Sequence, residues 1–419
     1  MFLEKAYLTS DIIRMQLPNG VTIITKEIYP AKVACFGVWI RSGSIDEPED
    51  LKGISHFVEH MLFKRTPKRG LGEISRQINA LGGYLNGSTS YTFTNYWVVV
   101  PSKYFDVALD IQTDAVLNPI FDDYDIEKER KVILEEIKMG MDSPSNFLFD
   151  KLLEEAYKKH PLRHSILGYE DILNKIDKNT LKKYYTEKYV PNNIVITAVG
   201  DIKSEEVIKS VTNLYGGLKN VPLSVNLFDA DEPRQAGFRY KEYTGDVKKA
   251  YLMMAFHIPT LLHRDIYALD LLAVAMGEGL SSRLNVVLKE KKMLVNYIYT
   301  GILSGNYPGL FLIEANLDKE DVKKAVEEIF KEIDKVKYKL IPNQELKKAK
   351  NLFLSDYIFS QEAVEEQSEN IGYYEIAGDC MLSEEFPKRM LEVEAKDMRK
   401  VAQDYLNREN CSVAVYLPK

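Results

Sequence analysis

The chain has 419 residues, with 55 Lys or Arg and 62 Asp or Glu, which gives a net charge of −7. This acidic balance argues against nucleic acid as a partner, because phosphate binding requires a basic surface. Hydrophobic residues make up 45% and charged residues 28%, which is typical of a folded globular protein, and the length favours more than one domain.

Neither export nor membrane insertion is indicated. The N-terminal residues lack the basic start, long apolar run and cleavage site of a signal peptide. No apolar run approaches the roughly 18 residues of a membrane-spanning helix. Cys35, Cys380 and Cys411 are too scattered for a disulfide framework or a metal motif, so we interpret them as reduced core residues. We therefore expect a cytoplasmic protein.

Strands and helices are predicted to follow one another along the first half of the chain. Runs of β-branched and aromatic residues bounded by Gly, Pro or Asn predict strands at 21–25, 33–40, 92–100 and 193–200. Apolar residues at helical spacing predict helices at about 52–66, 71–81, 103–117 and 123–157. This mixture predicts an α+β fold.

The first predicted helix carries two of the chain's six histidines in the pattern His56-x-x-Glu59-His60. Residues i and i+4 share one helix face, so both imidazoles can reach a single ion. Neutral imidazoles suit zinc, and a catalytic zinc site needs a third protein ligand. The order H-x-x-E-H is typical of one class of zinc proteases, in which the glutamate would take a proton from zinc-bound water. Simple polar contacts on a half-buried helix are the weaker alternative, because an apolar helix tolerates such groups poorly unless they are paired.

The third ligand is expected from the helix predicted at 123–157. Glu129 and Glu136 are seven residues apart and therefore project from the same side of that helix. Glu135 points about 100° away from Glu136. One member of the pair would bind the ion and the other could orient a histidine. The alternative is an ordinary solvated face, which is the usual role of a Glu-rich helix.

A repeat at constant offset indicates two related domains. Three pairs of segments are about 217 residues apart, namely 33–40 and 250–258, 103–116 and 319–333, and 190–201 and 406–418. We predict a tandem of domains at 1–218 and 237–419, joined by a linker at 219–236 that has no helical period. The same offset carries the histidine motif to 273–277, where no histidine occurs. The second domain is therefore expected to lack the metal motif.

These motifs resemble those of the pitrilysin-type (M16) metallopeptidases, the inverzincins. The chain looks closest to their processing-peptidase branch, which includes the mitochondrial processing peptidase β subunit and bacterial relatives. The resemblance covers nearly the whole chain. The matching stretches lie in its first half and are LPNGVTIIT, GISHFVEHMLFKRT, LGGYLNGSTSYTFTNYWVVV, IEKERKVILEEI, HPLRHSILG and VPNNIVITAVGD. The resemblance implies a Zn²⁺ site with ligands His56, His60 and Glu136, with Glu59 as the base and Glu129 supporting a ligand. It also implies two α/β-sandwich domains that form half of a clam-shell.

In this family an unfolded peptide adds as a strand to a sheet edge near the zinc. The matching edge is 84–92, with Asn86 and Gly87 at the place of the family's Asn-Ala pair. Gly87 departs from that pattern. It still offers backbone hydrogen bonds to a substrate, but it loosens the strand.

A second departure concerns partners. Family members that work alone carry an Arg and a Tyr seven residues apart in the C-terminal half, and these positions match Lys289 and Asn296 here. Tyr297 is one residue away, which on a strand turns it to the other face. The resemblance therefore implies a heterodimer in which a homologous subunit supplies the Arg/Tyr pair, with a homodimer as the other possibility.

The sequence thus predicts a zinc-dependent metalloendopeptidase that hydrolyses peptides or unfolded segments in an enclosed chamber. The alternative is a catalytically weak or inactive scaffold subunit of a larger complex. Inactive members of the family usually lose part of the motif, whereas His56, Glu59, His60 and Glu136 are all present here.

Overall fold

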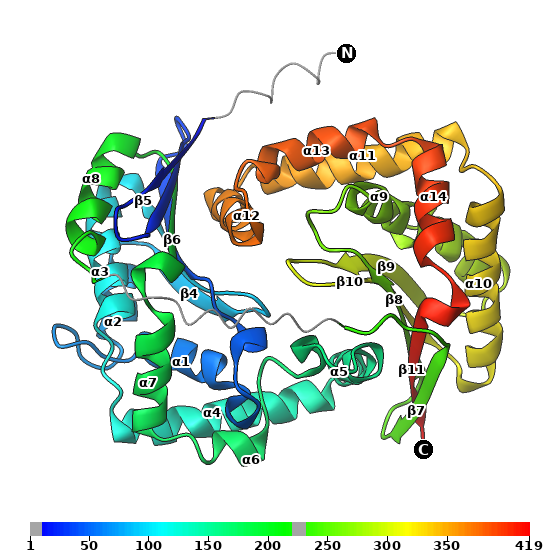
Figure 1. The fold of residues 1–419 in the computed structure, drawn as a ribbon, viewed down its shortest axis with the longest axis horizontal. Coiled ribbons are helices and arrows are strands. Elements are labelled where there is room, and N and C mark those ends of the chain that lie inside the picture. The colour runs from blue at the N-terminus through cyan, green and yellow to red at the C-terminus, as the bar shows by residue number, and fades with distance from the viewer. Residues whose placement is uncertain (1–10, 220–231) are drawn as a thin grey trace. The chain divides into compact units, whose positions relative to one another are not determined.

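The computed structural model describes residues 11–219 and 232–419 (Figure 1). These residues form two compact units. The first comprises the described residues of Met1–Ile137, Ser165–Asp229 and Phe359–Glu384, and the second comprises those of Lys138–His164, Ala230–Ile358 and Glu385–Lys419. Each unit therefore includes a segment from the other half of the chain, an exchange that the predicted domains 1–218 and 237–419 did not include. Most of the predicted linker at 219–236 lies outside the described residues, so the domain boundaries stay a prediction.

A six-stranded sheet forms the centre of the first unit. Its strands are β1 (Ile12–Gln16), β2 (Thr22–Glu27), β3 (Val33–Ile40), β4 (Tyr84–Thr89), β5 (Thr94–Pro101) and β6 (Ile194–Gly200). They are ordered β1-β2-β6-β3-β5-β4, with β2 and β6 parallel and every other neighbouring pair antiparallel. The strand β4 therefore lies at one end of the sheet.

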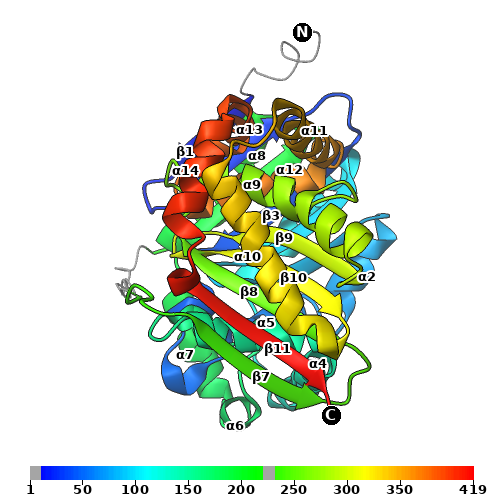
Figure 2. The same cartoon turned by 90° about the vertical axis from the view of Figure 1, so that its right-hand side faces the viewer.

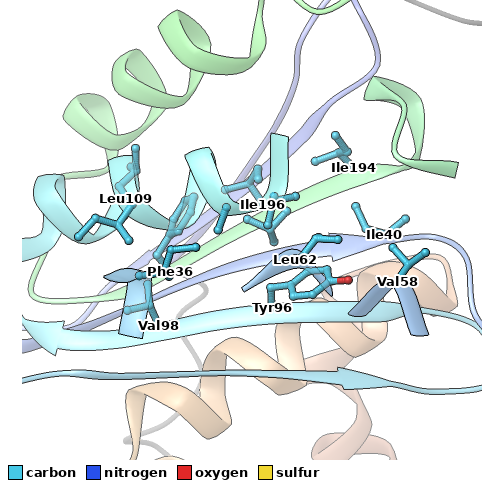
Figure 3. Packing of buried hydrophobic residues seen from close by; sticks show 14 of the residues in the cluster. Phe36, Ile40, Val58, Leu62, Tyr96, Val98, Leu109, Ile194 and Ile196 are labelled. Atoms are coloured by element: carbon cyan, nitrogen blue, oxygen red, sulfur yellow. The ribbon is translucent and has the colours of Figure 1, made fainter. Parts of the chain in front are cut away.

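The helices of the first unit are α1 (Ile54–Leu62), α2 (Glu73–Ala80), α3 (Phe105–Leu117), α4 (Asp123–Asp142), α6 (Glu170–Leu173), α7 (Lys178–Lys188), α8 (Ser204–Tyr215) and α12 (Val364–Ala377). Alternate strand residues such as Phe36, Val98 and Ile196 pack with Leu109 of α3 and Val58 of α1 (Figure 3). Because successive strand residues point to opposite faces, this layer buries one face of the sheet. The helix that carries both histidines is part of the same core.

The opposite face of this sheet is covered by α12, which comes from the second half of the sequence. Its Ile371 packs in one apolar cluster with Trp39 of β3. Glu375 is 1% exposed, and its carboxylate accepts hydrogen bonds from Arg14 at 2.9 Å and Arg41 at 2.7 Å. Apolar packing and a doubly bonded buried carboxylate therefore both fix α12 on the sheet.

The second unit repeats this plan. Its strands are β7 (Arg239–Gly245), β8 (Ala250–Ile258), β9 (Tyr297–Leu303), β10 (Gly309–Leu317) and β11 (Cys411–Pro418), in the order β7-β11-β8-β10-β9. The parallel pair β7 and β11 corresponds to β2 and β6, and the terminal strand β9 corresponds to β4. The predicted tandem of two related α+β domains is confirmed by this shared strand order.

The helices of the second unit are α5 (Pro144–Ala156), α9 (Ile266–Gly277), α10 (Val322–Tyr338), α11 (Asn343–Ser360), α13 (Leu382–Glu392) and α14 (Ala395–Tyr405), with a π-helical segment at Asn285–Lys291 (Figure 2). The helix α5 packs on β8 and β11. The prediction of one helix at 123–157 was wrong, because α4 ends at Asp142 and α5 begins at Pro144. Proline lacks the N–H that an interior helical residue donates, but it fits the first position of a helix, so the chain breaks into two helices there. No helix in the described ranges is both long and apolar enough to span a membrane.

Candidate active site

The helix α1 begins against a buried carboxylate. Gly53, the residue before the helix, has a φ of 96°, a conformation that favours glycine. The Glu47 carboxylate accepts hydrogen bonds from the backbone N–H groups of Gly53 at 2.8 Å and Ser55 at 2.7 Å. A helix leaves its first N–H groups without internal partners, and its N-terminus favours negative charge. Glu47 thereby fixes the start of the helix that carries the histidines.

Three side chains from α1 and α4 converge on one point. Figure 1 shows these two helices in the first unit. One nitrogen from each of His56 and His60 and one oxygen of Glu136 all lie within 4.8 Å of one another. Glu136 Oε2 is 3.7 Å from His56 Nε2 and 3.5 Å from His60 Nε2. Two imidazole nitrogens and one carboxylate oxygen are the donor set of a catalytic zinc site, which keeps a fourth position for water or substrate.

Glu129 lies behind His60, on the side away from Glu136. Glu129 Oε2 is 3.2 Å from His60 Nδ1, and Oε1 accepts a hydrogen bond from Lys64 Nζ at 2.8 Å. Since an ionised carboxylate only accepts, His60 Nδ1 carries the proton and Nε2 is left to face Glu136. Burial is the largest single influence and opposes ionisation of both partners. For His60, the hydrogen bond to Glu129 and the nearby carboxylates together outweigh burial, so the pKa of His60 is raised. For Glu129, the hydrogen bonds to His60 and Lys64 and the charges of both together outweigh burial, so the pKa of Glu129 is lowered. The spacing argument had left the roles of the two glutamates open. In the structure Glu136 lies near the Nε2 atoms of both histidines, whereas Glu129 lies near Nδ1 of His60.

His56 is held in its neutral form. Burial, followed by the charge of His60, lowers the pKa of His56 to about 3. Its Nδ1 is buried and has no hydrogen-bond partner among the described residues. A neutral imidazole keeps a lone pair for a metal ion. The residues present therefore fit a zinc ion held by His56 Nε2, His60 Nε2 and the Glu136 carboxylate.

Glu59 lies on α1, beside this cluster and beneath the strand β4. Its Oε2 accepts a hydrogen bond from Thr89 Oγ1 at 3.0 Å. A Cβ added at Gly87 would lie 3.1 Å from Glu59 Oε1, so the strand crosses directly over the carboxylate. Burial raises the pKa of Glu59, although His60 and Thr89 act in the opposite direction. Such a shift brings a carboxylate closer to the range in which it can exchange protons.

The strand β4 offers a free backbone edge. It is the last strand of its sheet, so its outer edge pairs with no other strand in the described part of the chain. Asn86 is exposed, and its Oδ1 accepts a hydrogen bond from Gly87 N at 2.9 Å. On the other face of the sheet, Tyr84 and Trp97 both donate to the carboxylate of Glu365 on α12. The edge is thus held in place and open to an extended chain.

The positions matched to the family's Arg/Tyr pair lie in the second unit. Lys289 belongs to the π-helical segment. The Asn296 side chain donates to Asn316 Oδ1 at 3.2 Å. Tyr297 begins β9 and is 48% exposed. Neither matched position carries an arginine or a tyrosine, as the sequence indicated.

Thr89 contacts the proposed base, and the sequence analysis did not name it. It lies two residues after Gly87, and residues i and i+2 of a strand share a face. The spacing from Gly87 to Thr89 was the signal in the sequence that could have found this residue. The spacing points to Glu59 only when the position of the strand over Glu59 is known.

Comparisons with known proteins agree with this geometry. The family model described as Insulinase (Peptidase family M16) matches residues 22–170, and that described as Peptidase M16 inactive domain matches 175–353. The first of these ranges contains His56, Glu59, His60 and Glu136, whereas the second contains none of them.

Similar proteins include zinc proteases and a processing peptidase. The Bacillus subtilis "Uncharacterized zinc protease YmxG" is 30% identical, over 87% of this chain and 88% of that protein. The Arabidopsis thaliana "Probable mitochondrial-processing peptidase subunit beta" is 27% identical, over 96% of this chain and 77% of that protein. The crystal structure of a protease from Helicobacter pylori superposes with a TM-score of 0.93 and 25% identity, covering 97% of this chain and 99% of the other. The chain therefore belongs to the M16 family of metallopeptidases, and zinc is its expected cofactor.

Proposed function

We propose that the chain is a zinc-dependent endopeptidase that hydrolyses peptides or unfolded segments, with His56, His60 and Glu136 as metal ligands and Glu59 as general base. One observation carries the proposal. The three ligand atoms gather within 4.8 Å of one another beside a glutamate whose pKa is raised by burial. This combination provides a metal site and a proton acceptor at one place.

In the proposed reaction Glu59 takes a proton from the attacking water, and the resulting oxygen attacks the carbonyl carbon of the peptide bond. The chemistry that zinc supplies at such a site is Lewis acidity toward the scissile carbonyl and the water. Glu59 then passes the proton to the nitrogen of the leaving amine as the C–N bond breaks. The Glu129 carboxylate keeps the His60 ring in one tautomer throughout.

The substrate would bind as an extended strand on the free edge of β4, near Asn86 and Gly87. Main-chain hydrogen bonds at a sheet edge recognise any unfolded segment, because they do not depend on side chains. This mode suits a peptidase that acts on peptides, and Gly87 keeps the strand close to Glu59.

A heterodimer is the proposed assembly. Lys289 and Asn296 occupy the places of the family's Arg/Tyr pair, and the Asn296 side chain is already bonded to Asn316. A homologous M16 chain that carries the pair would complete the site, with a homodimer as the other arrangement.

The test is cleavage of a quenched-fluorescent peptide library by the purified, zinc-loaded chain. His60→Ala serves as the blank, and Glu59→Gln as a variant that keeps the metal ligands. Cleavage that both substitutions abolish would support the proposal. Zinc binding without cleavage, even with a homologous M16 chain added, would refute it and favour a scaffold subunit. Cleavage only with the added chain would support the heterodimer.

A further inference from the structure

We propose that Thr89 is a positioning residue for the catalytic base. Its hydroxyl fixes one carboxylate oxygen of Glu59, so that the other oxygen is the one that accepts the proton of the attacking water. This inference rests on the proposed function, because it assigns a task within the same reaction.

Thr89 is the sole hydrogen-bond donor to Glu59 within residues 11–219 and 232–419. The bond joins Thr89 Oγ1 to Glu59 Oε2 at 3.0 Å. A threonine hydroxyl has a single proton, so this contact commits it to that oxygen. A glutamate side chain has high rotamer freedom, and without the bond Glu59 could turn about its own torsions. The hydroxyl therefore selects one orientation of the base.

The second oxygen, Oε1, has different surroundings. A Cβ built on Gly87 would lie 3.1 Å from Oε1, 3.2 Å from Phe63 Cε2 and 3.2 Å from Tyr96 Cδ1. Aromatic carbon and a glycine backbone thus border this side of the carboxylate. No described residue donates a hydrogen bond to Oε1, so its lone pairs stay available. The two oxygens of one carboxylate are therefore chemically distinct at this site.

The strand that fixes the base is also the strand proposed to receive the substrate. Gly87 and Thr89 point to the α1 face of β4, where Glu59 lies, while its free edge points away from the sheet. A peptide paired with that edge would be placed relative to a base that the same strand orients. Reactions gain most when both reacting groups are held in one rigid frame.

A merely structural role would make Thr89 a residue that stabilises the strand. The two roles differ in what a substitution changes. Loss of strand stability would lower the unfolding midpoint or raise KM. Loss of base orientation would lower kcat while leaving KM and zinc content unchanged.

The experiment measures kcat and KM on a cleaved peptide for the zinc-loaded full chain, with its partner chain if cleavage requires one. Thr89→Val keeps the shape of the side chain and removes the hydroxyl. We expect kcat to fall about 10- to 100-fold, the range for a hydrogen bond to a charged group, with KM unchanged. Thr89→Ser should keep at least half of the activity, while Thr89→Ala, which differs from Ser by the hydroxyl alone, should lose as much as Val. Thr186→Val is the matched control, because within the described part of the chain its hydroxyl donates to carbonyls of its own helix.

An unchanged kcat in Thr89→Val would overturn the proposal, and so would a rise in KM alone. If Thr89→Val does not fold, the Ser and Ala variants decide, and equal loss in both would overturn it. Failure of the proposed function looks different: the unmodified chain would then cleave no better than His60→Ala.

Discussion

Replacing Glu129 by Gln is expected to weaken zinc binding without unfolding the chain. Glu129 is 6% exposed and supports His60 through the 3.2 Å contact between its Oε2 and Nδ1. Glutamine has the same shape and can still accept one hydrogen bond from His60, but it carries no charge. Its NH₂ group would face the Lys64 ammonium, which now donates to Glu129 at 2.8 Å. The substitution therefore removes charge behind His60 and leaves Lys64 without its acceptor.

The size of the effect follows from this geometry. Loss of a carboxylate behind a ligand histidine typically reduces metal affinity 10- to 100-fold, which corresponds to about 1.4–2.8 kcal/mol of binding free energy. We expect the lower part of this range, about tenfold, if the glutamine oxygen turns toward His60 and keeps that hydrogen bond.

Competition with a fluorescent zinc chelator, at one pH and one salt concentration, measures the dissociation constant directly. Glu127→Gln is the matched control, since Glu127 lies on the same helix, is mostly exposed and pairs with Arg130. Its zinc affinity should equal that of the unmodified chain. Unchanged affinity in Glu129→Gln, or an equal loss in the control, would refute the view that Glu129 supports the metal site.

Three further predictions concern partners, pH and stability. The double substitution Lys289→Arg and Asn296→Tyr should raise peptide turnover without a partner, and robust turnover by the unmodified chain alone would contradict the heterodimer. Burial raises the pKa of Asp270 from 3.8 to about 7 in the folded chain. The folded state therefore keeps a proton that the unfolded state has lost, so stability falls as pH rises from about 4 to 7. Asp270→Asn should remove this pH-dependent contribution, which is at most about 4 kcal/mol of unfolding free energy. Urea unfolding curves of the variant and the unmodified chain that are identical at both pH 5 and pH 8 would exclude this contribution. Glu365→Gln should lower the free energy of unfolding by about 1–2 kcal/mol, because it weakens two hydrogen bonds to a charged acceptor; in calorimetry the exposed neighbour variant Glu366→Gln should match the unmodified chain.

The clustering of the candidate metal ligands could be predicted because its geometry is local. His56 and His60 are one turn apart on one helix, and Glu129 and Glu136 are two turns apart on another, so helical periodicity alone orients each pair. The repeat was also readable, since strands of similar composition recur at a constant offset. The metal cluster was inferred from residue spacing within short helical segments, and the repeat was inferred from the constant distance between similar segments.

Features that depend on tertiary packing could not be predicted. An apolar strand face at Trp39 indicates burial, but its sequence does not name Ile371, from the other half of the chain, as the residue that covers it. The contact of Thr89 with Glu59 arises only when β4 is laid over α1. The strand β1 was missed because four of its five residues are exposed and its apolar pattern is weak.

The exchange of segments between the units has a consequence for biosynthesis. The sheet of the first unit is complete by Gly200, but the helix that covers its second face ends at Ala377. A ribosome adds about 5–20 residues per second, so that apolar face stays uncovered for roughly ten seconds or more while the rest of the chain is made. During translation the first unit cannot finish folding before the second is almost fully synthesised. A nascent chain of this design should therefore depend on chaperones that shield exposed sheet surfaces, and truncation before residue 384 should yield an aggregating fragment rather than a smaller enzyme.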